Sequence, residues 1–177
     1  MLELPIKILK SNGQFDDNSP TIIMLCGQGS SGKTTFWRKY LRNKNIVAMD
    51  DIIIKLSNKY NYEQCHAIFH LLIEEATKID CINDVVLDFA HDTIDARKDS
   101  LIHISSPEHF NFLIIHLSLD FEILVENDKK RKQVFSLPKE QIEQMKKIYN
   151  LFIPPVLEEF KDYNFKSITL AEYKQLQ

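Results

Sequence analysis

The chain has 177 residues, a length that fits one folded domain with a substantial core. Hydrophobic residues make up 44% and charged residues 27%, which excludes a disordered composition. A net charge of -3 provides no global basic field, so the sequence excludes extended binding along a nucleic-acid duplex.

The chain carries no sequence signal for a membrane or for export. No apolar run approaches the roughly 18 residues of a membrane span, and the N-terminus lacks the pattern of a secretory signal. Cys26, Cys65 and Cys81 are an odd number without metal-ligand spacing, which favours buried thiols in a reducing compartment. We therefore expect a cytoplasmic protein in which residues 1–177 form a single domain and residues 1–20 an N-terminal extension.

The extension predicts an additional edge strand within Leu2–Leu9, followed by turn-forming residues. Thr21–Cys26 is an apolar run of the length of a buried parallel strand. The run breaks at Gly27 into the spacing G-x-x-x-x-G-K-T, which three of the chain's four glycines help to form.

This spacing is typical of a phosphate-binding P-loop. Glycines let successive backbone N–H groups turn toward phosphates, and the following helix adds its unsatisfied N-terminal donors. Lys33 is expected to reach the β- and γ-phosphates, and Thr34 to bind Mg²⁺. The candidate nucleotide contacts are Gln28, Gly29, Ser30, Ser31, Gly32, Lys33, Thr34 and Thr35.

After the loop, apolar strands alternate with amphipathic helices. This alternation predicts an α/β fold of the P-loop NTPase type, with a five-stranded, largely parallel sheet covered by helices on both faces. The further strands are expected over 45–49, 85–88, 110–119 and 165–170. The helices are expected from Thr34 to about Asn43, from Asp50 or Asp51 as N-cap, over 61–79, over 93–104 after an Asp92 cap, over 120–126, from Pro138, and as a short turn over 156–160.

Carboxylates follow two of these strands, at the sheet edge where parallel sheets bind ligands. Asp88 suits the Walker-B position, a carboxylate that helps to hold Mg²⁺ beside Thr34, and its alternative is a turn cap. Asp50 suits a general base that accepts a proton from an attacking hydroxyl. The alternative for Asp50 and Asp51 is helix capping, and Asp51 is also a candidate for contact with the acceptor.

Three other candidates come from the second half of the chain. The basic run Lys129–Lys132 predicts either a solvated helix end or part of a lid over residues 127–137, in which Arg131 stabilises the transferring phosphoryl group. Arg97 and His91 follow Asp88 and are candidates for acceptor contact. An exposed helix charge and an inactive loop histidine are their alternatives.

His66 and His70 lie four residues apart on one predicted helix. The sequence offers no third ligand beside them, so it does not predict a metal site there.

The order of these motifs resembles that of the small P-loop kinases related to bacteriophage polynucleotide kinase, within an AAA-type ATPase group, over about 21–170. The resemblance implies that Lys33 and Thr34 hold ATP and Mg²⁺, that Asp50 is the general base and that Arg131 is the lid arginine. It also matches Pro138 to the helix after the lid, and Pro154 with Glu158 and Glu159 to a closing segment.

Two positions depart from the polynucleotide kinase pattern. Ile53 stands where that family has an arginine, and Phe89-Ala90-His91 replaces a short polar motif. Because the family uses these positions to contact the acceptor, kinases of small molecules, such as chloramphenicol phosphotransferase and the zeta-toxin group, remain an alternative.

The sequence therefore predicts a kinase that transfers the γ-phosphate of ATP to a hydroxyl of a nucleic-acid end, a nucleotide or a small molecule. The competing hypotheses are a nucleotide-binding switch or ATPase without an acceptor, and a fold that serves only as an interaction surface.

Overall fold

The computed structural model describes residues 16, 18–132, 134, 136–160 and 165–169. The strand predicted within Leu2–Leu9 lies outside these residues. The strands are β1 (Thr21–Cys26), β2 (Asn45–Ala48), β3 (Val85–Asp88), β4 (Asn111–His116) and β5 (Phe165–Thr169). The helices are α2 (Lys33–Tyr40), α3 (Met49–Leu56), α4 (Tyr62–Ala76), α5 (Ile94–Leu101), α6 (Phe121–Lys132) and α7 (Lys139–Leu151), with short 3-10 helices η2 (Pro107–His109) and η3 (Leu157–Phe160).

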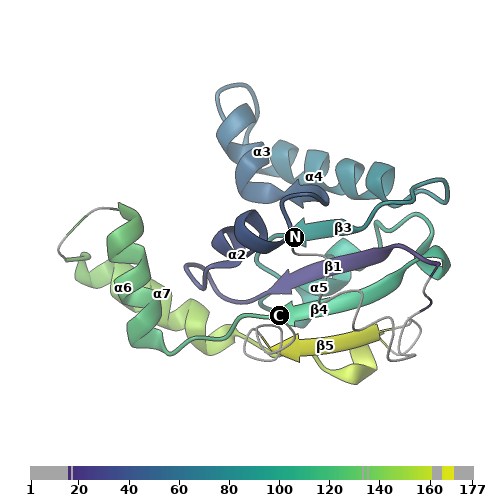
Figure 1. Ribbon diagram of the computed structural model, residues 1–177. Coiled ribbons are helices and arrows are strands. Elements are labelled where there is room, and N and C mark those ends of the chain that lie inside the picture. The colour runs from purple at the N-terminus through teal and green to yellow at the C-terminus, as the bar shows by residue number, and fades with distance from the viewer. Residues whose placement is uncertain (1–15, 17, 133, 135, 161–164, 170–177) are drawn as a thin grey trace.

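The strands form one parallel sheet in the order β2-β3-β1-β4-β5, with β1 in the centre (Figure 1). This order confirms the predicted α/β fold and its parallel sheet. Since every strand runs in the same direction, the carboxyl ends of β1, β2 and β3 lie at one edge, on the side where α6 and α7 stand in Figure 1. The P-loop and both groups of aspartates therefore meet there.

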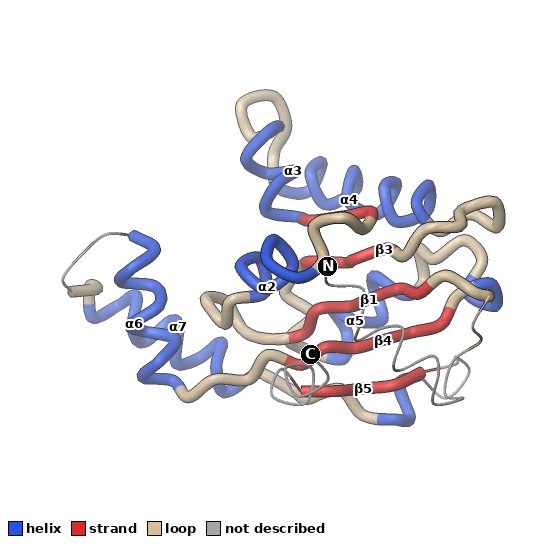
Figure 2. The backbone as a smooth tube through the Cα atoms, in the orientation of Figure 1, coloured by secondary structure: helices blue, strands red, loops and turns tan. Residues whose placement is uncertain are grey.

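The period of two along β1 divides the core between the two faces of the sheet. Ile22 and Met24 pack in a cluster with α4 and α5, while Ile23 and Leu25 pack in a second cluster with α2. Figure 2 shows the helices arranged around the sheet accordingly. All six residues of β1 are buried, which explains why its sequence is a continuous apolar run.

Two helix starts differ from the sequence prediction. β2 ends at Ala48 and α3 begins at Met49, so Asp50 and Asp51 lie in the first turn and neither caps the helix. Their carboxylates there still favour the positive end of the helix dipole. α5 begins at Ile94 with Thr93 as its cap, because the Thr93 hydroxyl accepts the Ala96 N–H at 3.2 Å. The prediction of Asp92 as the cap was wrong, and its carboxylate is not used in that role.

Other bounds shift by a few residues at element ends, where a sequence pattern is least informative. α4 ends at Ala76 and β4 at His116, earlier than expected, while α6 continues into the charged run, as expected, and ends at Lys132. Cys26 and Cys65 are buried as expected, but Cys81 is only partly buried. Among the described residues, no helix has the length and apolar character needed to cross a membrane.

A buried ion pair joins α5 to η3. The Arg97 side chain is fully buried, and its Nε and Nη2 atoms donate to the two carboxylate oxygens of Glu159, each at 2.7 Å. Its Nη1 atom donates to the backbone carbonyls of His91 and Ile153. The bidentate pair and these carbonyls together satisfy a charge that would otherwise be costly to bury.

We expect Glu159→Gln to lower the free energy of unfolding by about 3 kcal/mol, because the substitution leaves the buried Arg97 charge without its counter-charge. Urea denaturation of the two proteins measures the difference. Glu158→Gln changes an exposed neighbour and is the matched control, with an expected change below about 0.5 kcal/mol. Equal stability of the two variants would contradict the structural role of the pair.

Candidate active site

The loop between β1 and α2 has the backbone geometry of a phosphate-binding nest. Ser30 and Gly32 have positive φ angles of 64° and 93°, and Gly32 leads directly into α2. A Cβ atom on Gly27 would lie 2.4 Å from the Leu117 carbonyl oxygen and 2.9 Å from the Ser31 hydroxyl, so this position requires glycine. Gly29 has open space around it.

Lys33 lies across this loop. Its ammonium group donates to the carbonyls of Gly27 at 2.7 Å and Gln28 at 3.1 Å. Burial lowers the pKa of Lys33, while the charges of Asp88, Asp92 and Asp50 act in the opposite direction. Among the described residues, the buried Ser31 hydroxyl and the Gln28 amide oxygen have no hydrogen-bond partner. A cationic group, an unpartnered hydroxyl and a nest of backbone donors fit a phosphate group.

One oxygen of Asp88 joins β3 to α2. It accepts hydrogen bonds from the Thr34 hydroxyl at 3.0 Å and from the Trp37 indole N–H at 2.6 Å. Thr34 and Trp37 are three residues apart and so share one face of α2. Burial raises the pKa of Asp88, which Lys33 and these two donors oppose. A threonine hydroxyl and a carboxylate this close form an oxygen donor set suited to Mg²⁺.

Asp50 and Asp51 differ in their surroundings although they are neighbours on α3. Asp51 forms an ion pair with Arg38 of α2 at 3.2 Å. Asp50 is exposed, and its negative charge opposes the lowering of the Lys33 pKa by burial. Both residues lie in the first turn of α3, at the carboxyl edge of the parallel sheet, and the ion pair with Arg38 distinguishes Asp51 from Asp50.

Helix α6 is bonded to the P-loop through two adjacent residues. Asn127 donates to the Ser30 carbonyl at 3.1 Å, and the Ser30 hydroxyl donates to Asp128 at 3.0 Å. Asp128 is 2% exposed and also accepts bonds from Gln141 of α7 at 2.7 Å and from Arg131. Burial alone would raise the pKa of Asp128, but the bonds from Arg131, Lys132 and Ser30 hold it below its ordinary value.

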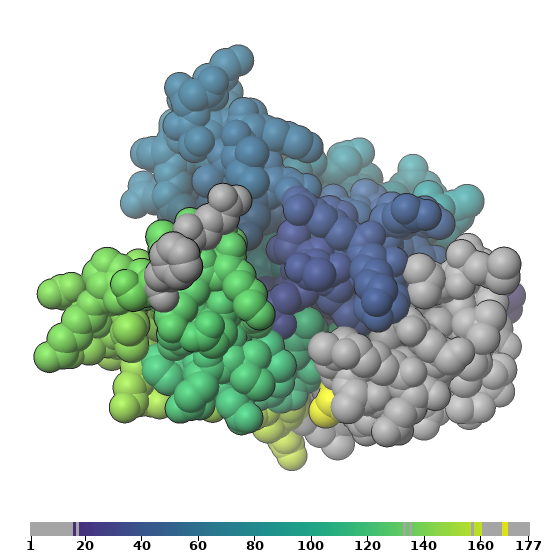
Figure 3. Space-filling model, turned by 60° about the vertical axis from the view of Figure 1, so that its left-hand side comes forward, coloured from purple at the N-terminus to yellow at the C-terminus, as the bar shows by residue number. Residues whose placement is uncertain are grey.

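A cavity of about 540 Å³ lies between the P-loop, α6 and α7. Gln28, Gly29 and Ser30 line it from the P-loop and Arg131 from α6. Figure 3 shows the face where α6 (green) stands beside α2 (purple-blue), with α3 above them. Arg131 is exposed and lies within the residues predicted as a lid. Because it lines the same cavity as the P-loop residues, its side chain lies near the P-loop.

His91 and Arg97, the two candidates for acceptor contact after β3, lie inside the fold. His91 is fully buried, with its ring nitrogens 3.2 Å from the Leu25 carbonyl and 2.8 Å from the Ser100 hydroxyl. Burial lowers the pKa of His91 to about 3, so its imidazole is neutral at pH 7. Arg97 is held by Glu159, so the exposed helix charge considered for it was wrong.

Sequence reasoning missed two residues of this edge. Asp92 was assigned to a helix cap, yet its negative charge opposes the lowering of the Lys33 pKa by burial. Asp128 was not singled out because it lies in a charged run, and an acidic residue before four basic ones is typical of a solvated helix end. Its position three residues before Arg131 was the available signal, because that spacing places the two side chains together on a helix.

A protein-family model described as an AAA domain matches residues 22–152, from β1 to the end of α7. The chain belongs to this family. A comparison with curated proteins gives no match for the chain.

The fold of this AAA-domain chain is shared with solved structures that include kinases. A chain of the Pnkp1/Rnl/Hen1 RNA repair complex aligns with a TM-score of 0.57 and 22% identity, over 79% of this chain and 50% of that chain. This protein thus spans about half the length of that relative. A candidate kinase from Chloroflexus aurantiacus aligns with a TM-score of 0.64 and 12% identity, over 91% of both chains. A gluconokinase from Sinorhizobium meliloti aligns with a TM-score of 0.52 and 14% identity, over 90% of this chain and 89% of that chain. The chain therefore has the fold of the small P-loop kinases, as the sequence predicted.

We expect Lys33→Ala to weaken binding of ATP with Mg²⁺ at least about tenfold, because the substitution removes a charged donor from the phosphate nest. Isothermal titration calorimetry measures the affinity. Lys39→Ala, which removes an exposed lysine from the same helix, is the control and should leave the affinity unchanged. Equal ATP affinity of the wild type and Lys33→Ala would contradict the assignment of this loop as a phosphate-binding site.

Proposed function

We propose that this protein is a kinase that transfers the γ-phosphate of ATP to a hydroxyl group. The observation that carries the proposal is the hydrogen bond between Thr34 and Asp88 at 3.0 Å, next to a lysine that lies across the P-loop. A carboxylate and a hydroxyl suited to Mg²⁺ lie close to groups suited to phosphate, which supports phosphoryl transfer from ATP.

The donor half of the site is built from the P-loop. The backbone N–H groups of the loop and the Ser31 hydroxyl bind phosphate oxygens, and Lys33 exchanges its two carbonyl contacts for the β- and γ-phosphates. Thr34 and Asp88 would hold Mg²⁺, which would supply positive charge to offset the charge that develops on the phosphates. Arg131, at the rim of the cavity, supplies a planar cation to the transferring group.

Asp50 is the proposed general base. Its carboxylate is exposed and lies in the first turn of α3, just after β2, and its negative charge affects the pKa values of both Lys33 and Asp88. An acceptor hydroxyl placed there would donate its proton to Asp50 while its oxygen attacks the γ-phosphate. Asp51 is less suited because Arg38 pairs with it.

The acceptor class follows from the relatives and from the residues near Asp50. We propose a nucleic-acid end or a nucleotide first, on the resemblance to polynucleotide kinases and the likeness to a chain of an RNA repair complex. One observation favours a small hydroxylated molecule as the second candidate. Ile53 and Phe89, which stand at the acceptor-contacting positions of polynucleotide kinases, pack against the apolar core.

A panel of acceptors incubated with γ-labelled ATP and Mg²⁺ tests the proposal. The panel contains a 5′-hydroxyl oligonucleotide, nucleosides and small polyols or sugar acids, and the measurement is label on each acceptor. Label on one class confirms a kinase and identifies its acceptor class. Release of free phosphate alone would support a switch or ATPase instead, and failure to bind ATP would support an interaction surface.

We expect Asp50→Ala to lower the transfer rate about 10²- to 10⁴-fold on the acceptor so identified, because the variant lacks the group that accepts the proton. ATP affinity, measured separately, should stay within a factor of about two of the wild type. Asp51→Ala is the matched comparison and should retain most of the activity. Near-normal turnover by Asp50→Ala would refute the assignment, and loss in Asp51→Ala alone would move the role to Asp51.

A further inference from the structure

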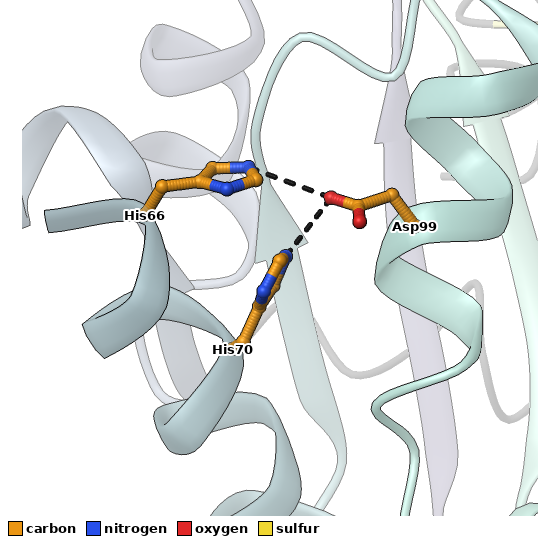
Figure 4. Close-up of side chains that lie close together, drawn as sticks. All are labelled: His66, His70 and Asp99. Atoms are coloured by element: carbon orange, nitrogen blue, oxygen red, sulfur yellow. Dashed lines mark hydrogen bonds and ion pairs between the residues drawn. The ribbon is translucent and has the colours of Figure 1, made fainter. Parts of the chain in front are cut away.

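A second cluster of potential ligands lies on the face of the sheet that α4 and α5 cover. His66 and His70, one turn apart on α4, both point toward Asp99 of α5 (Figure 4). The Nε2 atoms of His66 and His70 lie 3.5 Å and 2.9 Å from the same Asp99 oxygen, Oδ2. Asp99 is the third ligand that the sequence alone did not reveal, because it lies 29 residues beyond His70 and meets it only through the packing of the two helices.

The donor set has the composition and size of a transition-metal site. One ligand atom from each of the three residues lies within 4.8 Å of the others. Imidazole nitrogen binds Zn²⁺ at about 2.0–2.1 Å and carboxylate oxygen at about 2.0–2.2 Å, so small rotations of these side chains bring all three atoms onto one ion. Two imidazoles and one carboxylate suit Zn²⁺ much better than Mg²⁺, which prefers oxygen ligands alone.

We propose that His66, His70 and Asp99 form a Zn²⁺ site that joins α4 to α5. The three side chains are 26%, 15% and 38% exposed, so an ion can enter from solvent and water can complete its coordination. The site is separate from the Thr34 and Asp88 pair in both residues and ligand chemistry, and it does not depend on the proposed kinase activity.

Neighbouring side chains hold the two imidazoles in place. The ring of His103 stacks on that of His70 with centroids 3.9 Å apart, and His103 Nδ1 lies 2.7 Å from Glu74 Oε1. On the other side, the His66 ring contacts Phe89 at a centroid distance of 5.3 Å. These ring contacts restrict the rotation of the two imidazoles and so favour a site that is largely formed before an ion binds.

The contact between His66 and Phe89 links the proposed site to the loop that follows β3. Phe89 directly follows Asp88 and begins the loop that leads to α5. An ion that holds α4 against α5 would therefore also stabilise the packing of Phe89 at the start of that loop. We expect the ion to stabilise α4, α5 and the loop between β3 and α5, and to leave the P-loop contacts unchanged.

Metal titration of the purified full chain tests the site. Zn²⁺ is titrated in excess Mg²⁺ and without nucleotide, and bound metal is measured by calorimetry and by elemental analysis after gel filtration. We expect one tight equivalent in the wild type and a loss of affinity of at least about tenfold in Asp99→Asn and in His66→Gln. Co²⁺ substitution should give the visible absorption bands of a tetrahedral ion, and Zn²⁺ should raise the unfolding temperature of the wild type but not that of Asp99→Asn or His66→Gln.

Matched controls separate this site from other zinc ligands. His109→Gln removes a histidine outside the cluster and Cys81→Ser removes the partly exposed thiol, and both should retain the tight equivalent. Lys33→Ala should retain it as well, which distinguishes failure of this proposal from failure of the kinase proposal. Circular dichroism verifies that each variant is folded. Absence of tight Zn²⁺ binding in the wild type, or equal binding in folded Asp99→Asn and His66→Gln, would show that the cluster is only a polar contact between helices.

Discussion

The hydrogen bonds to one oxygen of Asp88 are the interaction on which the candidate active site depends. Thr34 and Trp37 both donate to it, so the first two turns of α2 are tied to the end of β3. The same two contacts fix where the P-loop sits, because the loop joins β1 directly to α2. The Trp37 ring is buried in the core beneath that helix, while its N–H group bonds to Asp88. The pair Trp37 and Asp88 therefore couples the apolar packing to the geometry of the site. A change in the packing under α2 would therefore also shift the backbone of the P-loop.

Much of this arrangement was predictable because short, continuous stretches of the sequence specify it. The apolar run Thr21–Cys26 and the glycine spacing that follows it define a strand and a loop without reference to the rest of the chain, and both are found as predicted. Asp88 and Asp50 became candidates through the rule that parallel strands end at one edge. The rule needs only the strand positions, which the apolar runs give.

The remainder depends on tertiary contacts that carry no local signal. Neither interpretation of Arg97, as an acceptor contact or as an exposed helix charge, included its ion pair, because its partner Glu159 lies 62 residues away. Asp128 looked like a solvated helix end because its partner Ser30 lies 98 residues away. In both cases a charged side chain is buried against a distant segment, and composition alone favours the exposed interpretation. Helix starts were misplaced for a related reason, since Thr93 and Asp92 are both good caps and only the backbone decides between them.

The ion pair of Arg97 and Glu159 also has a consequence for where the folding unit ends. The family match stops at residue 152, before Glu159 and before β5. A chain cut at that boundary would lack the carboxylate that neutralises a fully buried guanidinium, and it would expose the edge of β4 that β5 covers. The shared sequence pattern is therefore shorter than the physical unit, because Glu159 and the β5 strand also belong to the packed fold.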